Sequence, residues 1–107
     1  MIARHDSREP EQAGTGVARK VLARGGELMM VEVVFEKDAV GPVHAHPHEQ
    51  ASYVLRGAFE LEMGGVKETI RAGDSFYVPA DALHGVVALE PSVILDVFTP
   101  QRQDFLK

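Results

Sequence analysis

Short runs of hydrophobic residues, separated by glycine and proline, cover most of the chain, and this pattern predicts many strands and little helix. The clearest run is 28–36, where Val31, Val33 and Phe35 should share one face of an extended strand. We predict nine strands, at 17–22, 28–36, 44–46, 51–56, 58–63, 66–70, 75–78, 85–89 and 92–98. So many short strands indicate an all-β sandwich or barrel.

Residues 58–70 predict a β-hairpin. Phe59, Leu61 and Met63 alternate with two glutamates, so the hydrophobic side chains should point inward. Gly64 and Gly65 follow, and glycine accepts the positive φ values that a two-residue hairpin turn requires. Residues 66–70 should then return as the partner strand.

Length and composition predict one domain. A chain of 107 residues with 45% hydrophobic residues can form one core, and the absence of cysteine excludes disulfide scaffolds and cysteine-based metal or catalytic sites. We expect residues 1–14 to form a polar, irregular segment of the same domain as a barrel over 15–107. The tail from Thr99 also looks irregular, although Phe105 and Leu106 predict that it packs against the domain.

The charge pattern bears on partners and location. A net charge of −5 without a basic stripe argues against nucleic acid. The charged N-terminus is unlike a secretory signal, and no hydrophobic run approaches the roughly 20 residues of a membrane span. We therefore expect a cytoplasmic protein that binds neither nucleic acid nor membrane.

The histidines cluster beside two prolines. His44, His46 and His48 lie within five residues, and His84 follows a later proline-containing turn. In extended backbone, His44 and His46 point to the same side and can bind one metal ion. The alternative is that the clustered histidines are exposed turn residues and that His84 is an ordinary core residue.

Two spaced motifs resemble the cupin superfamily, whose patterns run roughly G-x5-H-x-H-x3,4-E-x6-G and G-x5-P-x-G-x2-H-x3-N. The matching positions are His44, His46, Gln50 and Gly57 in the first motif, and Gly73, Pro79 and His84 in the second. The chain departs from the patterns at four positions: Gln50 replaces Glu, Asp81 replaces Gly, Ala88 replaces Asn, and Gly41 lies closer to His44 than expected.

This resemblance implies a single-domain cupin β-barrel, also described as a double-stranded β-helix or jelly roll. It also implies a divalent metal held by His44, His46, Gln50 and His84. His48 matches no ligand position and is interpreted as supporting the ligands or lining the pocket rim. Glu49 lies one residue short of the ligand position, so we give it a structural or supporting role.

A glutamine ligand changes the predicted chemistry. Three imidazoles and an amide are neutral, so the ion keeps its full charge and favours an anionic ligand. Oxygen chemistry of the two-histidine, one-carboxylate kind is disfavoured, and a Lewis-acid role is favoured. The donor set suits Ni, Zn, Fe, Co or Mn.

Asp96 and Arg102 are the further candidates. If Val93, Leu95 and Val97 pack between the sheets, Ile94, Asp96 and Phe98 share the other face, which could line the barrel mouth. A carboxylate in so apolar a strand needs a partner or a task, unless it simply faces water on an edge strand. Arg102 could bind an acid bidentately, or be an ordinary surface arginine.

Three longer stretches, 28–37, 44–50 and 95–105, resemble the KdgF family of pectin-degradation cupins. The resemblance implies metal-dependent, non-redox ring opening of 4,5-unsaturated monouronates to linear 5-keto-4-deoxyuronate. It places the active-site acid, aromatic residue and arginine at Asp96, Phe98 and Arg102, and makes a small anionic sugar acid the expected substrate.

Two other functions remain open at this point. One is a non-catalytic, metal-containing cupin that binds a small acid or sugar, which would not need Asp96. The other is a cupin dioxygenase, against which Gln50 argues. We also predict a homodimer, because an open sheet edge and hydrophobic N-terminal strands at 17–22 or 28–35 need covering.

Overall fold

The computed structural model describes residues 1–106 and contains ten strands and two single-turn 3₁₀ helices within them. The elements are η1 (His5–Ser7), β1 (Glu11–Gly14), β2 (Val17–Gly25), β3 (Leu28–Phe35), β4 (Val40–His44), β5 (Glu49–Arg56), β6 (Ala58–Met63), β7 (Val66–Arg71), β8 (Ser75–Val78), β9 (His84–Ala88), β10 (Ser92–Thr99) and η2 (Gln103–Phe105). The predicted all-β class is therefore confirmed.

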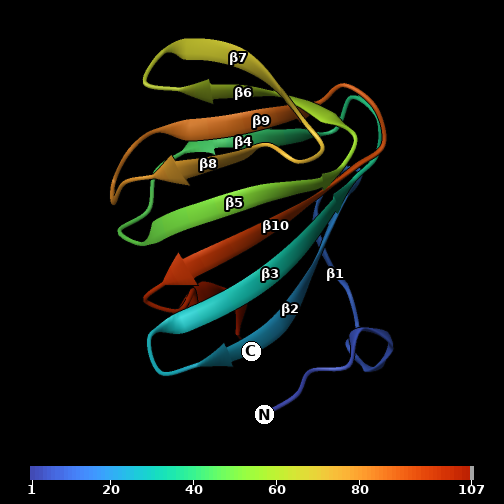
Figure 1. Ribbon diagram of the computed structural model, residues 1–107, viewed down its shortest axis with the longest axis vertical. Helices are drawn as coiled ribbons and strands as arrows, with labels where there is room; N and C mark the ends of the chain where they lie inside the picture. The colour runs from blue at the N-terminus through green and yellow to red at the C-terminus, as the bar shows by residue number, and fades with distance from the viewer. Residues whose placement is uncertain (107) are drawn as a thin grey trace.

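The strands form two antiparallel sheets (Figure 1). One sheet has six strands in the order β1-β2-β3-β10-β5-β8, and the other has four in the order β4-β9-β6-β7. Since strands far apart in sequence are neighbours in both sheets, the chain crosses between them repeatedly, as in a jelly roll.

The main core lies between the two sheets. Phe35 from the larger sheet and Phe59 from the smaller one meet edge to face, with ring centroids 5.0 Å apart. Gly57 begins the crossing into the smaller sheet with a φ of +84°. A Cβ at this position would collide with Ser92, so the motif glycine is required by packing as well as by backbone conformation.

The strand β10 lies between β3 and β5. Its residues Asp96 and Phe98 stand opposite Ser52 and Gln50 of β5. Ile94 and Phe98 are buried and face the barrel interior together with Asp96. The expectation that Val93, Leu95 and Val97 pack between the sheets is wrong: they alternate with the inward-facing set and are only partly buried.

The predicted hairpin at 58–70 is confirmed, with Met63 paired to Val66 across Gly64 and Gly65. Two expectations about strand limits are wrong. The strand expected at 44–46 ends at His44, because the chain leaves the sheet before Pro47. Residues 11–14 are not irregular but form β1, since their backbone pairs with β2.

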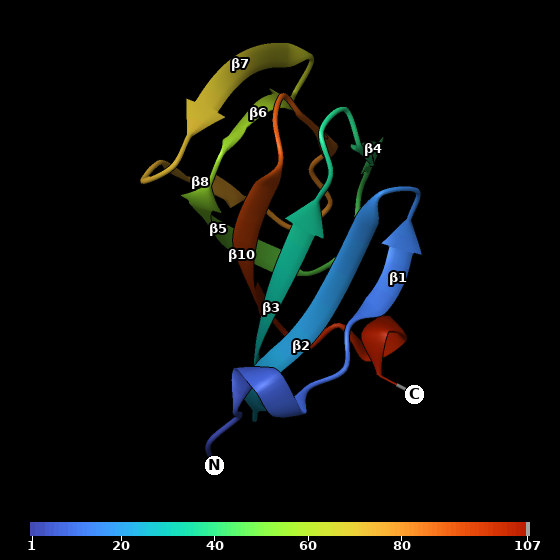
Figure 2. The same cartoon turned by 90° about the vertical axis from the view of Figure 1, so that its right-hand side faces the viewer.

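The C-terminal tail returns to the larger sheet beside β2, as both views show (Figure 2). Phe105 and Leu106 pack on a second buried cluster formed by Met29, Val31 and Phe98. The expected packing of the tail is therefore confirmed. This packing brings the residues between Thr99 and Leu106 close to the strand that carries Asp96.

The helices described for residues 1–106 are too short to cross a membrane. The edges of the larger sheet are β1 and β8. Both predicted dimer segments fall on β2 and β3, which are paired on each side. Any contact with a second copy through these two strands must therefore use the sheet face, whereas β1 offers an edge.

Candidate metal centre and active site

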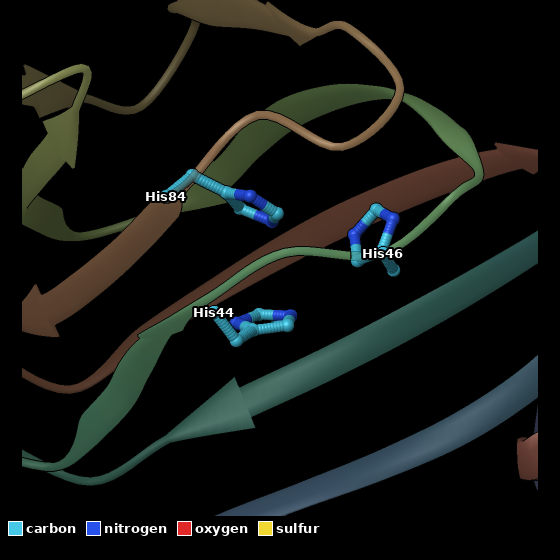
Figure 3. Close-up of side chains that lie close together, drawn as sticks. All are labelled: His44, His46 and His84. Atoms are coloured by element: carbon cyan, nitrogen blue, oxygen red, sulfur yellow. The ribbon is translucent and has the colours of Figure 1, made fainter.

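The imidazole rings of three histidines, His44, His46 and His84, lie close together (Figure 3). His44 ends β4, His84 begins β9 and is its direct partner across the strands, and His46 lies in the connection to β5. Their ring centroids are 4.6–5.4 Å apart, and each ring offers a nitrogen within 4.8 Å of the others. Three ring nitrogens at this separation can bind one metal ion.

Each of these rings is oriented by a backbone carbonyl. The Nδ1 atoms of His44, His46 and His84 lie 2.8, 3.0 and 2.9 Å from the carbonyl oxygens of residues 42, 48 and 82. A carbonyl can only accept, so each Nδ1 carries the proton. The Nε2 lone pairs are then free to bind a metal, which is the arrangement typical of metal-ligating histidines.

Gln50 adds an oxygen to this cluster. Its Oε1 lies 3.0 Å from His46 Nε2, while its Nε2 donates to Ser52 Oγ at 2.9 Å and to Asp96 Oδ1 at 3.3 Å. With His46 neutral, two lone pairs face each other across 3.0 Å, and a cation bound by both would relieve the repulsion. The donor set of these described residues therefore fits a metal ion.

Burial favours the neutral form of two of the three rings, those of His46 and His84. His46 and His84 are 7% and 5% exposed, and their removal from water lowers the pKa of both rings. The positive charge of Arg102 lowers both pKa values further. A neutral imidazole is the form that binds a metal, so these effects prepare the site for one.

Asp96 lies behind Gln50 in the same hydrogen-bond chain. Ser52 Oγ donates to Asp96 Oδ1 at 2.6 Å, and the two residues are cross-strand partners on β5 and β10. Burial raises the pKa of Asp96 from 3.8 to about 6, although Ser52, Arg102 and Gln50 each lower it. A carboxyl group with this pKa can both accept and release a proton near neutral pH.

A cavity of about 300 Å³ connects these groups. Its walls include His44, His84, Gln50, Asp96, Phe98 and Arg102. Arg102 is buried and its guanidinium carbon lies 5.1 Å from the Phe98 ring centroid. It is therefore a residue of the cavity wall and not an ordinary surface arginine.

The partner of Arg102 differs from the expectation. Its Nε and Nη2 donate to the two oxygens of Asp104 at 3.0 and 2.9 Å, so a bidentate acid already lies on one side of the guanidinium. Pattern reading missed Asp104, because its role depends on the return of the tail. It also missed Ser52, although Ser52 lies two residues after Gln50 and therefore on the same face of β5.

His48 and Glu49 are not in the histidine cluster. The carbonyl of His48 accepts the His46 Nδ1 proton, and its ring lies 6.5 Å from that of Phe98, measured between centroids. Glu49 is exposed and accepts a hydrogen bond from the Tyr77 hydroxyl at 2.6 Å. The supporting roles expected for these two residues stay a prediction.

The turn before His84 explains one departure from the cupin motif. Asp81 occupies the glycine position and has a φ of +66°, a conformation that aspartate tolerates better than most residues. Its amide donates to the His46 carbonyl at 2.8 Å. Gly85 lets β9 approach β4, since a Cβ there would lie 2.8 Å from Val43 N. These contacts bring His84 beside the other two rings.

A comparison with family models matches residues 31–98 to the cupin domain. The pectin degradation protein KdgF of Dickeya dadantii (strain 3937) is 43% identical over 98 residues, which cover 90% of this chain and 89% of that protein. The chain is a cupin of the KdgF family.

Solved structures agree with this assignment. KdgF from Halomonas sp. superposes with a TM-score of 0.94 at 40% identity, covering 99% of this cupin and 98% of that chain. An RmlC-like cupin from Shewanella frigidimarina NCIMB 400 also gives a TM-score of 0.94, at 41% identity, and the match covers 98% and 95% of the two chains. The predicted cupin jelly roll is thus confirmed.

The metal ligands of this cupin stay a prediction, and metal content tests them. We expect purified protein to carry about one divalent transition metal per chain and His46→Ala to lose most of it, because one of the converging nitrogens is removed. Elemental analysis measures both. His5→Ala is the matched control, since His5 is exposed and bonds to Glu32 away from the cluster. Equal metal content in all three proteins would contradict the assignment.

A second prediction concerns the stability of the metal-free protein. The pKa of Asp96 is raised from 3.8 to about 6 in the folded protein, so the ionised carboxylate is less favourable there than in the unfolded chain. Above pH 6 this lowers the free energy of unfolding by up to about 3 kcal/mol. Asp96→Asn keeps an acceptor oxygen for Ser52 and loses the charge. It should therefore be more stable than wild type at pH 8, and the gain should vanish as the pH falls through 6 toward 4.

Urea denaturation in the presence of a chelator measures this difference. The two proteins share every other titratable group, so comparing them at each pH removes the contributions that they have in common. Asp6→Asn, at a fully exposed position, is the control and should show no such gain. A destabilised Asp96→Asn protein at pH 8 would refute the predicted cost of the buried charge.

Proposed function

We propose that this cupin opens the ring of 4,5-unsaturated monouronates, formed in pectin or alginate breakdown, to give linear 5-keto-4-deoxyuronate. The observation that carries the proposal is the position of Asp96: a buried carboxyl group in the cavity wall, linked through Ser52 and Gln50 to three converging histidines. The similarity to KdgF proteins over almost the whole chain supports it.

His44, His46, Gln50 and His84 are the proposed metal ligands. Because all four are neutral, a bound divalent ion would keep its charge and supply Lewis acidity toward the acid group and the ring-side oxygen of the substrate. The identity of the ion does not alter the roles of the other residues.

Asp96 is proposed to move the proton. The substrate is a cyclic enol ether with a hydroxyl group on the anomeric carbon. When the hydroxyl group loses its proton, the anomeric carbon becomes an aldehyde and its bond to the ring oxygen breaks. The electrons of that bond stay on the ring oxygen, which becomes the oxygen of an enolate. The enolate then takes a proton at carbon 4 and becomes the ketone. The proton lost and the proton gained balance, so one carboxyl group with a pKa of about 6 can serve both steps without redox chemistry.

Arg102 and Phe98 are proposed to position the substrate. The Nη1 side of Arg102 is not used by Asp104, so it can bind an acid group in the cavity. Phe98 forms an apolar wall against which a sugar face can pack. Phe98 follows Asp96 on β10, and Arg102 follows in the tail. All three side chains line the same cavity.

Turnover by two variants tests these roles. Asp96→Asn should retain fold and metal but lose about 10²–10⁴ in kcat, the usual effect of removing a general acid–base group. Arg102→Ala should mainly raise KM, because orienting an acid group stabilises ground and transition states alike. Loss of absorbance at the substrate double bond measures the rate with metal-loaded protein.

Three outcomes would contradict all or part of the proposal. Wild-type turnover that Asp96→Asn leaves unchanged would remove Asp96 from the mechanism. Absence of turnover with each of the metals Ni, Zn, Fe, Co and Mn would favour a binding protein for a small acid or sugar. Oxygen uptake during substrate loss would instead indicate a dioxygenase.

A homodimer is also proposed. The outward-facing side chains of the larger sheet include exposed Val34, Tyr53 and Tyr77, and the β1 edge is open to a second strand. Because a second copy can cover such surfaces, we expect light scattering to give about twice the chain mass of 11.7 kDa at micromolar concentration. A mass near 11.7 kDa would contradict the dimer.

A further inference from the structure

Asp104 holds the guanidinium of Arg102 on one side. Arg102 Nε lies 3.0 Å from Asp104 Oδ1, and Arg102 Nη2 lies 2.9 Å from Asp104 Oδ2. The two parallel bonds form a bidentate pair with fixed geometry. The Arg102 side chain is 11% exposed, whereas that of Asp104 is 59% exposed, so the pair runs from the cavity wall to the protein surface.

Aromatic rings hold the same guanidinium from other directions. Its central carbon lies 4.2 Å from the Phe105 ring centroid and 5.1 Å from that of Phe98. Phe105 itself is fixed by Phe98 at 5.8 Å and by the Arg19 guanidinium at 3.9 Å. The faces of the Arg102 guanidinium are thus against aromatic rings, and its Nε side is bound to Asp104. The remaining side, formed by Nη1 and the second proton of Nη2, is the one that can bind a ligand.

Arg102 has two acidic residues near it, Asp96 and Asp104, and they lie on different sides of it. Arg102 and Asp96 line the same cavity, and Asp104 does not. The hydrogen bonds from Arg102 lower the pKa of the Asp104 carboxyl group and so favour its ionised form. If the Arg102 side chain were free to rotate, its positive charge would be attracted to the Asp96 carboxylate, which is the acid in the cavity wall. Asp104, which lies outside the cavity wall, instead binds the Arg102 guanidinium in one orientation.

We propose that Asp104 is a positioning residue that fixes Arg102 so that its remaining side receives the acid group of the substrate. The inference rests on the proposed function only for the nature of the substrate. According to this inference, selectivity for sugar acids over neutral sugars depends on Arg102, which binds the ligand, and on Asp104, which does not touch it. Asp104 acts through Arg102, to which it is bound by two hydrogen bonds.

Direct binding tests the proposal without turnover. Isothermal titration of metal-loaded protein with D-galacturonate, a saturated sugar acid, and with D-galactose, its neutral match, measures acid selectivity. We expect Asp104→Asn to weaken galacturonate binding by about tenfold, because a guanidinium that is no longer held in place makes one charge-assisted hydrogen bond fewer to the acid group, and to leave galactose binding unchanged. Asp104→Glu, which restores the carboxylate, should recover part of the affinity.

A double-mutant cycle separates positioning from a general structural effect. If Asp104 acts through Arg102, the variant with both Arg102→Ala and Asp104→Asn should bind galacturonate no more weakly than Arg102→Ala alone. In the turnover assay, Asp104→Asn should raise KM about tenfold with kcat within about threefold of wild type. Asp6→Asn removes the same charge at a fully exposed site and should change neither value.

The outcomes distinguish this inference from the proposed function. Additive losses in the double variant, or unchanged galacturonate affinity in Asp104→Asn, would overturn the role of Asp104 even if the enzyme opens unsaturated uronates. A wild-type protein that binds galacturonate selectively but has no turnover would reject the proposed reaction, and the cycle would still decide the role of Asp104.

Discussion

Burial of the Asp96 carboxylate is the constraint on which the site depends. A charge in the barrel interior must have hydrogen-bond donors, and the available ones are the Ser52 hydroxyl and the Gln50 amide. Because the nitrogen of Gln50 faces Asp96, its oxygen must face His46. One buried acid thereby orients the amide, and the amide completes the donor set of the three histidines.

The charges in the cavity favour an acidic ligand. Burial favours the neutral form of His46 and His84, Gln50 is neutral, and the positive end of the Arg102–Asp104 pair faces inward. Asp96 is the one acid among the cavity residues of the described chain, and its raised pKa reduces its negative charge near neutral pH. A site with a glutamate in place of Gln50 would carry one more negative charge and would attract the same ligand less strongly.

The sequence predicted the residues that obey local rules. Two-residue alternation placed Asp96 on a face with Phe98, and the resemblance to the cupin motifs implied that His84 joins His44 in one site. Strand limits at 11–14 and 44–46 failed because pairing with β2 and departure from the sheet depend on tertiary contacts. Asp104 was missed for the same reason, since the course of the tail follows from packing of Phe105.

The central place of β10 has a consequence for how the protein assembles. Without it, the larger sheet would consist of two separate parts, β1-β2-β3 and β5-β8. Joining them pairs Asp96 with Val31 and with Ser52, and both contacts close long chain loops at a cost in chain entropy. Since Asp96 and Phe98 lie on this strand, the cavity does not exist before the sheet closes. Completion of the larger sheet and formation of the cavity therefore depend on the same strand.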